Sequence, residues 1–430
     1  MSHPEVHPLR MTLEEKYDRG DGDDLSHRTI RLTYKGAYDT EILDVSLRRT
    51  IRVPDNDKAY ALPPDLGAFP IYSVDRYKGN LPESMVTKGG AFVPIHQREA
   101  MWIDFTSRHA FAVKVCVGGV NAVSGECAVE SPETHRRRQE MLAKGKPIQD
   151  YVVTGRNGQL WLDGIAKLDG KVMQFVATPA GDGYSVEAQI TGADAFCGIQ
   201  IEVIPSVTKV RADAKIFVIT ETGKRVNLIV DLTKTVRELR TTFYHTAGSH
   251  IFGKRLIFRG RELKDDEIGP RGSQKPLSAP ANAHPEMAIA PGGLIKQRIV
   301  KDFVPSQDWD KQNGLRFNIQ MLNAEVFEKV VGIKPPATPI SAATYAEHGY
   351  PFYEMHEGLS GIHGAFPVQS VAHMESLKGG KTSSDGSADA KLQFNKVSLD
   401  PSTPQVPFRS VSELEAQLRN LGLLRAPSGQ

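Results

Sequence analysis

One stretch in the middle of this 430-residue chain, residues 214–266, constrains the fold more than any other. Apolar residues alternate at Ile216 and Val218 and again after Gly223, which is the pattern of two strands joined by a turn. A Thr-x-x-Glu motif at residues 235–238 is typical of a helix start, because its two side chains satisfy exposed backbone amides. The order of strand, turn, strand, capped helix and further strand predicts a small α+β unit.

This segment resembles ubiquitin, with which it aligns without a gap over residues 216–265. The resemblance implies a ubiquitin-like β-grasp fold, which we assign to residues 207–269. Its final strand is not evident, and residues 286–290 are the extended candidate for it. The matching core positions are Ile216, Val218, Val226, Leu228, Val230, Val236, Leu239, Phe243, Leu256 and Leu263.

The departures from ubiquitin favour a fixed recognition module over a transferable modifier. Ile257 keeps an isoleucine of ubiquitin's recognition patch, whereas Glu221 replaces the leucine of the first turn. Gly292-Gly293 resembles a modifier's terminal diglycine, but Pro291 precedes it and more chain follows, so we expect a loop there. Basic residues around Ile257 suit a protein partner with an acidic surface. The predicted partner-binding face consists of Arg255, Ile257, Arg259 and Gly260.

Composition excludes several classes of protein. A net charge of +2 does not indicate a nucleic-acid-binding chain. The three cysteines have no C-x-x-C spacing, which fits free thiols in a reducing compartment and supplies no structural zinc site. No stretch reaches the ~18–20 apolar residues of a transmembrane helix, and the N-terminal residues lack a signal-peptide core. We therefore expect a soluble protein of the cytoplasm or nucleus, with no metal, cofactor, membrane or nucleic-acid partner.

The rest of the chain predicts a multidomain protein that is mainly β with some α+β structure. Residues 28–206 consist of short alternating segments between Gly, Pro, Asn and Asp, which is typical of a β-sandwich or barrel-like domain. A charged insertion at residues 131–147 is expected to be helical or looped. The other expected parts are a disordered tail (1–27), a linker (270–285), an α+β segment (286–376) with a helix at 324–331, a disordered linker (377–409) and an amphipathic helix (410–424).

The amphipathic helix can either dock on a partner or fold back onto its own protein, and folding back is the more ordinary outcome. The sequence at residues 369–374 is similar to that at 409–414, and we interpret the two as similar helix starts.

Several phrases outside the ubiquitin-like segment resemble an uncharacterised family of fungal and bacterial proteins, some of which contain an internal ubiquitin-like domain. They include QREAMW at residues 97–102, QDYVV at 149–153 and WLDG at 161–164. The family has no assigned activity, so the resemblance implies a domain order and no mechanism.

Two functions therefore remain open. The favoured one is a non-enzymatic adaptor that binds proteins through the ubiquitin-like segment. The alternative is an enzyme or small-ligand-binding protein, in which carboxylates could support acid–base chemistry. An Arg–Glu ion pair beside a strand explains the same residues structurally. The candidate pocket of this alternative comprises Arg98, Glu99, Trp102, Trp161 and Asp163.

Overall fold

The computed structural model describes twelve stretches of the chain and divides it into two compact units. The larger unit is Met1–Val207 with Lys275–Gln430, and the smaller unit is Thr208–Gln274. The described residues are 7–14, 27–35, 40–56, 58–61, 64–207, 213–219, 225–231, 256–258, 261–263, 284–337, 363–379 and 406–424.

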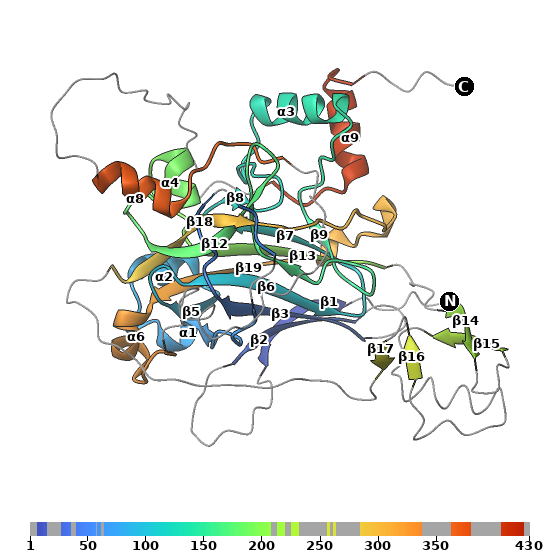
Figure 1. The fold of residues 1–430 in the computed structure, drawn as a ribbon, viewed down its shortest axis with the longest axis horizontal. Coiled ribbons are helices and arrows are strands. Elements are labelled where there is room, and N and C mark those ends of the chain that lie inside the picture. The colour runs from blue at the N-terminus through green and yellow to red at the C-terminus, as the bar shows by residue number, and fades with distance from the viewer. Residues whose placement is uncertain are drawn as a thin grey trace. The chain divides into compact units, whose positions relative to one another are not determined.

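The larger unit is built on one large, mainly antiparallel β-sheet (Figure 1). In order across the sheet its strands are β1 (His7–Glu14), β2 (Thr29–Lys35), β3 (Thr40–Thr50), β6 (Ala100–Ser107), β12 (Val172–Pro179), β18 (Glu286–Ile295), β19 (Leu315–Asn323), β13 (Ile199–Pro205), β7 (Phe111–Val117) and β8 (Val120–Asn121). Shorter strands join this path at its sides: β4 (Tyr72–Ser73), β5 (Ala91–Ile95), β9 (Val152–Val153), β10 (Trp161–Leu162) and β11 (Gly164–Ala166).

The paired strands form a closed circuit around the core. Strand β9 pairs with β7 and strand β10 pairs with β6. The turn between β9 and β10 is closed by Gln159, whose backbone N donates to Val153 O at 2.6 Å. Strand pairs therefore run from β6 through β12, β18, β19, β13 and β7 to β9, and the turn from β9 to β10 leads back to β6. Residues from several strands of this circuit, such as Phe105, Phe175 and Ile319, share one buried cluster.

Period-two alternation explains most of these strands. In β2, the buried residues Ile30, Leu32 and Tyr34 alternate with more accessible polar ones. Strand β18 differs, because it is paired on both edges and every one of its residues is buried. A central strand covered on both faces has no reason to alternate.

Strand β18 corrects the expectation that Gly292 and Gly293 form a loop. Both glycines lie within the strand, where its register with β12 shifts in a bulge-like irregularity. A Cβ on Gly292 would lie 2.5 Å from Val176 Cγ2, and a Cβ on Gly293 would lie 2.6 Å from Pro54 O. The glycines are therefore required by close packing inside the sheet.

A second apolar cluster covers one end of the sheet. Three helices contribute to it: α1 (Val74–Tyr77), α2 (Glu83–Lys88) and α6 (Ala324–Val331). Its centre is aromatic, with Tyr72 ring centroids 5.5 Å from Phe92 and 5.3 Å from Phe327. Helix α6 has the bounds that its sequence predicts, because Asn323 caps its start and Gly332 adopts a left-handed conformation at its end.

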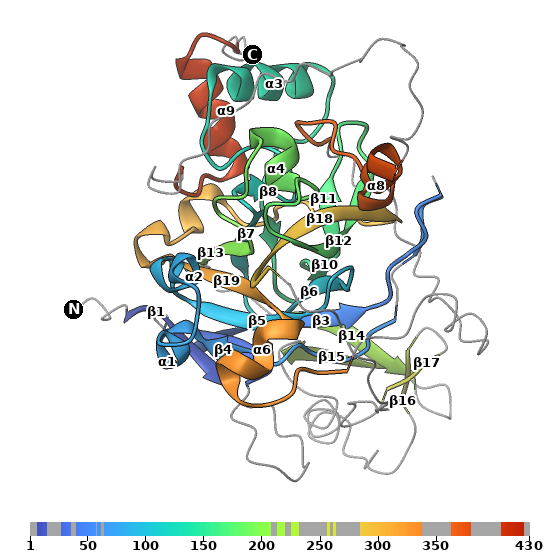
Figure 2. The same ribbon diagram turned by 90° about the vertical axis from the view of Figure 1, so that its left-hand side faces the viewer.

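The other helices among the described residues lie along the larger unit's surface (Figure 2). They are α3 (Pro132–Ala143), α4 (Val186–Thr191), α8 (Val371–Gly379) and α9 (Val411–Asn420), with two 3-10 turns, η1 (Ser306–Asp308) and η2 (Lys311–Asn313). The charged insertion is thus helical and begins with a capping box at Ser131 and Thr134. The predicted C-terminal helix folds back, since Leu414 and Leu418 of α9 pack with Met141 of α3.

The smaller unit contains two antiparallel strand pairs in its described residues. Strand β14 (Asp213–Ile219) pairs with β15 (Arg225–Asp231), as the alternation around Gly223 predicts. Strand β16 (Leu256–Phe258) pairs with β17 (Arg261–Leu263). The helix expected to begin near residue 235 lies outside the described residues.

The connection that carries the smaller unit joins two parallel strands. Both β13 and β18 run antiparallel to β19, so they are parallel to each other. Strand β13 ends beside the start of β19, where Val203 is opposite Leu315, whereas β18 begins near its end, where Glu286 is opposite Leu322. Leu315 and Leu322 are seven residues apart, so at about 3.3 Å per residue the two attachment points are separated by about 23 Å along β19.

This pairing differs from the domain order expected from the sequence. Residues 286–290, the candidate final strand of the ubiquitin-like fold, pair with β12 and β19 of the large sheet instead. The α+β segment that follows shares the core of residues 28–206, because β19 pairs with β13 and, in parallel, with β5.

Candidate functional site

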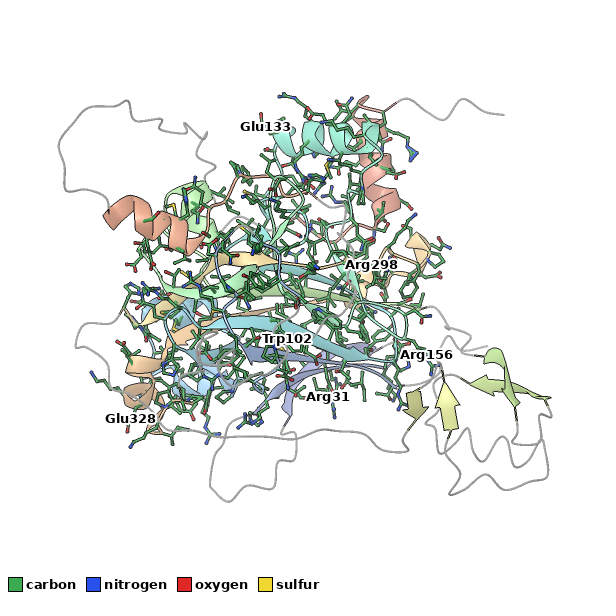
Figure 3. All side chains as sticks on the ribbon, in the orientation of Figure 1. Arg31, Trp102, Glu133, Arg156, Arg298 and Glu328 are labelled. Carbon is green, nitrogen blue, oxygen red and sulfur yellow. The ribbon has the colours of Figure 1, made fainter. Side chains whose placement is uncertain are left out.

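Three of the five candidate pocket residues come together on one face of the sheet. Trp161 of β10 lies opposite Asp104 of β6, and by the same register Asp163 comes beside Trp102. Trp102 is labelled in Figure 3. Trp161 Nε1 donates to Asp163 Oδ2 at 3.1 Å. The Arg48 guanidinium lies 6.0 Å from the Trp102 ring centroid. Trp102 is only 8% exposed, and its Nε1 has no hydrogen-bond partner among the described residues.

Arg98 and Glu99 lie elsewhere and have other partners. The Arg98 side chain pairs with Glu375 of α8 at 2.6 Å. The buried Glu99 carboxylate pairs with Arg49 at 2.6 Å and accepts from His96 N at 2.9 Å. Burial raises the pKa of Glu99, although the positive charge of Arg49 opposes the rise. Arg98 and Glu99 therefore do not pair with each other, and the structure places the five candidates in two separate groups.

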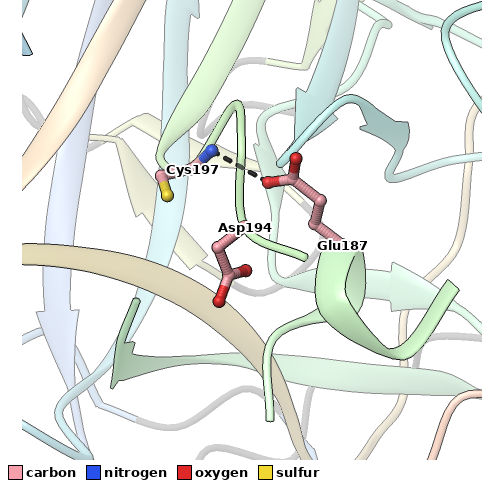
Figure 4. Close-up of side chains that lie close together, drawn as sticks. All are labelled: Glu187, Asp194 and Cys197. Carbon is pink, nitrogen blue, oxygen red and sulfur yellow. Dashed lines mark hydrogen bonds between the residues drawn. The ribbon is translucent and has the colours of Figure 1, made fainter. Parts of the chain in front are cut away.

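A possible ligand set for a metal ion occurs between α4 and β13 (Figure 4). Ligand atoms of Glu187, Asp194 and Cys197 lie within 4.8 Å of one another. The Glu187 carboxylate, however, accepts hydrogen bonds from the backbone N of Ala195, Phe196 and Cys197 at 2.8, 2.8 and 2.9 Å. Burial raises the pKa of the Cys197 thiol, so it stays protonated at neutral pH. The hydrogen bonds of Glu187 fix the backbone of the loop before β13.

Asp194 also stabilises this loop by hydrogen bonds. Its carboxylate accepts from Gly181 N at 2.7 Å and from the Ser185 hydroxyl. Buried carboxylates that accept several backbone donors are a common way to fix irregular chain. The three residues therefore have a structural use that needs no ion.

A further polar group, which sequence reasoning missed, lies on the outer face of β7 and β13. Four side chains form it, and we call them the polar cluster: Lys114, Cys116, Gln200 and Glu202. Strand register places Gln200 opposite Cys116 and Glu202 opposite Lys114. With Ala128 and Val406, they line a small cavity. The sequence feature that could have identified this cluster is a pair of polar or thiol residues at alternate positions in each of two otherwise apolar strands.

The charges of the polar cluster are balanced by neighbours. Lys114 Nζ lies 2.8 Å from Asp150 Oδ2, and Glu202 pairs with Arg316 at 2.8 Å. Burial alone would lower the pKa of Lys114, but Asp150 outweighs it, so the amine stays charged. Burial raises the pKa of Cys116 to about 12. A protonated, buried thiol is a poor nucleophile, so the cluster is paired and unreactive in this conformation.

The predicted partner-binding face falls mostly outside the described residues. Arg255, Arg259 and Gly260 lie outside them, whereas Ile257 lies in β16 opposite Glu262 of β17. This face therefore stays a prediction.

Comparison with known proteins bears on the same segment. Residues 216–267 match the model of the ubiquitin family. This segment is ubiquitin-like. The match confirms the resemblance seen in the sequence and covers one segment within a longer chain. No curated protein and no solved structure matches the chain.

None of the helices in the described part of the chain is long and apolar enough to span a bilayer.

Proposed function

We propose that this protein is a non-enzymatic adaptor that binds other proteins through its ubiquitin-like segment. The observation that carries the proposal is the match of residues 216–267 to the ubiquitin family. Ubiquitin-like domains generally act by binding proteins. The three buried cysteines, whose pKa values are all raised by burial, offer no activated thiol for catalysis.

The attachment of the segment supports fixed recognition. On one side, Val207 N donates to Asp308 O at 2.8 Å. On the other, Asn323 N donates to Pro285 O at 2.9 Å. Because both flanking residues are hydrogen-bonded to the larger unit, the segment stays attached to it while binding a partner and is not transferred as a modifier.

The proposed contact surface is Arg255, Ile257, Arg259 and Gly260. Its positive charges favour a partner with an acidic surface, because complementary charge speeds association and suppresses wrong partners. The free thiols support a reducing compartment, either the cytoplasm or the nucleus.

Affinity capture with the full chain tests this function. We expect the double variant Ile257→Ala, Arg259→Glu to lose the partners recovered by the unmodified chain. The matched control is Arg237→Glu, which makes the same charge change on the predicted helix of the segment and should retain them. Recovery of the same partners by the double variant would rule out this face as the recognition surface.

A further inference from the structure

We propose that residues 406–424, which we call the latch, open and close as one unit over the polar cluster of β7 and β13. The latch comprises the extended residues 406–410, helix α9 and the turn that follows it. This device is independent of the ubiquitin-like segment and concerns only the larger unit.

The latch is held by two apolar contacts and by the ion pair between Arg409 and Glu130. Near its start, the Phe408 ring packs on Tyr151 with centroids 4.8 Å apart and on Trp309 with centroids 5.9 Å apart. Further along, Leu414 and Leu418 of α9 are buried with Met141 and Ile148, which belong to α3 and the loop after it. In Figures 1 and 2, α9 and α3 lie side by side.

The start of the latch covers the polar cluster directly. Val406 lines the same cavity as Lys114, Cys116, Gln200 and Glu202. Phe408 N donates to Glu202 Oε1 at 3.3 Å, and Arg316 donates to Val406 O at 3.2 Å while also pairing with Glu202. Removing residues 406–408 would therefore bring water to the cluster.

Opening the latch breaks no strand pairing. None of its residues belongs to a strand of the sheet. Its backbone is attached by scattered bonds, such as Val411 N to the Tyr151 hydroxyl at 3.2 Å. The Lys311–Glu413 ion pair lies at the solvent-exposed rim, where such pairs contribute little. Proteins open locally, as cooperative units, at free energies below that of global unfolding.

Opening changes the environment of the covered residues. In the closed state burial raises the pKa of the Cys116 thiol, whereas Lys114 keeps its charge because Asp150 outweighs burial. When the latch lifts, Lys114 regains hydration and the pKa of Cys116 falls toward the ordinary thiol range. The closed latch thus keeps Cys116 inert, and the open latch makes it reactive.

Alkylation of Cys116 in the native full-length protein measures this opening. We would follow labelling by N-ethylmaleimide at pH 8, with peptide-resolved mass spectrometry for each cysteine. Cys197 is the internal reference, because it is buried in a different cluster with Ala180 and Ala288. A rise in labelling at Cys197 reports global unfolding.

Two leucines of the latch provide a matched pair of variants. Leu418 is 0% exposed and Leu421 is 52% exposed. We expect Leu418→Ala to raise the rate of Cys116 labelling on the order of a hundred-fold, as the loss of a buried leucine side chain implies, and Cys116 to be labelled much faster than Cys197 in both proteins, because opening of the latch requires less free energy than global unfolding. Leu421→Ala should change neither rate.

Two results would overturn the proposal that the latch opens as one unit. If Leu418→Ala leaves Cys116 labelling at the unmodified rate, the latch residues do not open together. If Cys116 is labelled no faster than Cys197 in the unmodified protein and in Leu418→Ala, exposure of Cys116 requires global unfolding and there is no latch.

Discussion

Replacing Glu130 with glutamine tests the ion pairs that join α3 to the latch. Burial alone would raise the pKa of Glu130, but the charges of Arg138 and Arg409 and their hydrogen bonds outweigh it and lower the pKa from 4.5 to about 2. The folded protein therefore favours the ionised carboxylate. Its contribution to stability is present above about pH 4.5 and is lost as the pH falls toward 2.

The size of this contribution follows from the same values. At about 1.36 kcal/mol per pH unit, the fall from 4.5 to about 2 corresponds to about 3 kcal/mol. Contact with water weakens such pairs, and 11% of the Glu130 side chain is exposed, so we expect about 2 kcal/mol. Glu130→Gln should thus lower the free energy of unfolding of the larger unit by about 2 kcal/mol at pH 7, and by less than about half of that at pH 3.

Urea unfolding followed by tryptophan fluorescence is the appropriate assay, because all three tryptophans of the chain, Trp102, Trp161 and Trp309, lie in the larger unit. The control is Glu140→Gln, which removes an exposed carboxylate of α3 and should cost less than ~0.5 kcal/mol. An unchanged stability of Glu130→Gln at pH 7 would refute the reasoning. So would an equal loss at pH 7 and pH 3.

Two further substitutions test other parts of the larger unit. Glu187→Gln should lower the free energy of unfolding by about 2–3 kcal/mol, because Cys197 N loses its charged acceptor. Added Zn²⁺ should not raise the melting temperature of the unmodified protein, and a rise would favour a metal site. Gly90→Ala should cost about 3 kcal/mol or more in urea unfolding, since its Cβ would lie 2.3 Å from Asn318 O, whereas Gly332→Ala, at a left-handed position with open space around it, should cost about 1 kcal/mol; equal costs would contradict the packing.

Local structure was readable from the sequence where short-range signals are strong. Alternation predicted a mainly β chain, and the caps of the 324–331 helix predicted its bounds. The ubiquitin-like segment was evident because many core positions match at fixed spacing, and the family comparison confirms it.

Strand pairing was not readable, because partners lie far apart in the chain and alternation does not identify them. Pairing of β12 with β18 joins residues 172–179 to residues 286–295 across the ubiquitin-like insertion. The Gly292-Gly293 pair has the local pattern of a loop, and only contact with Val176 and Pro54 explains its place in a strand.

The candidate sites show the same limit. Trp161 and Asp163 are two residues apart in one segment, so their hydrogen bond was within reach of sequence reasoning. The pairing of Glu99 with Arg49 instead of its neighbour Arg98 was not, since it depends on which strands meet.

The central claim, that the ubiquitin-like segment carries the binding function, is tested most directly by its replacement. Residues 208–274 would be exchanged for a Gly/Ser linker of about 20 residues, which with residues 275–283 is long enough to span the ~23 Å along β19 that separates the two attachment points. We predict that the exchanged protein unfolds in urea with the unmodified fluorescence transition but recovers none of the captured partners. Retention of those partners by the exchanged protein would contradict the account.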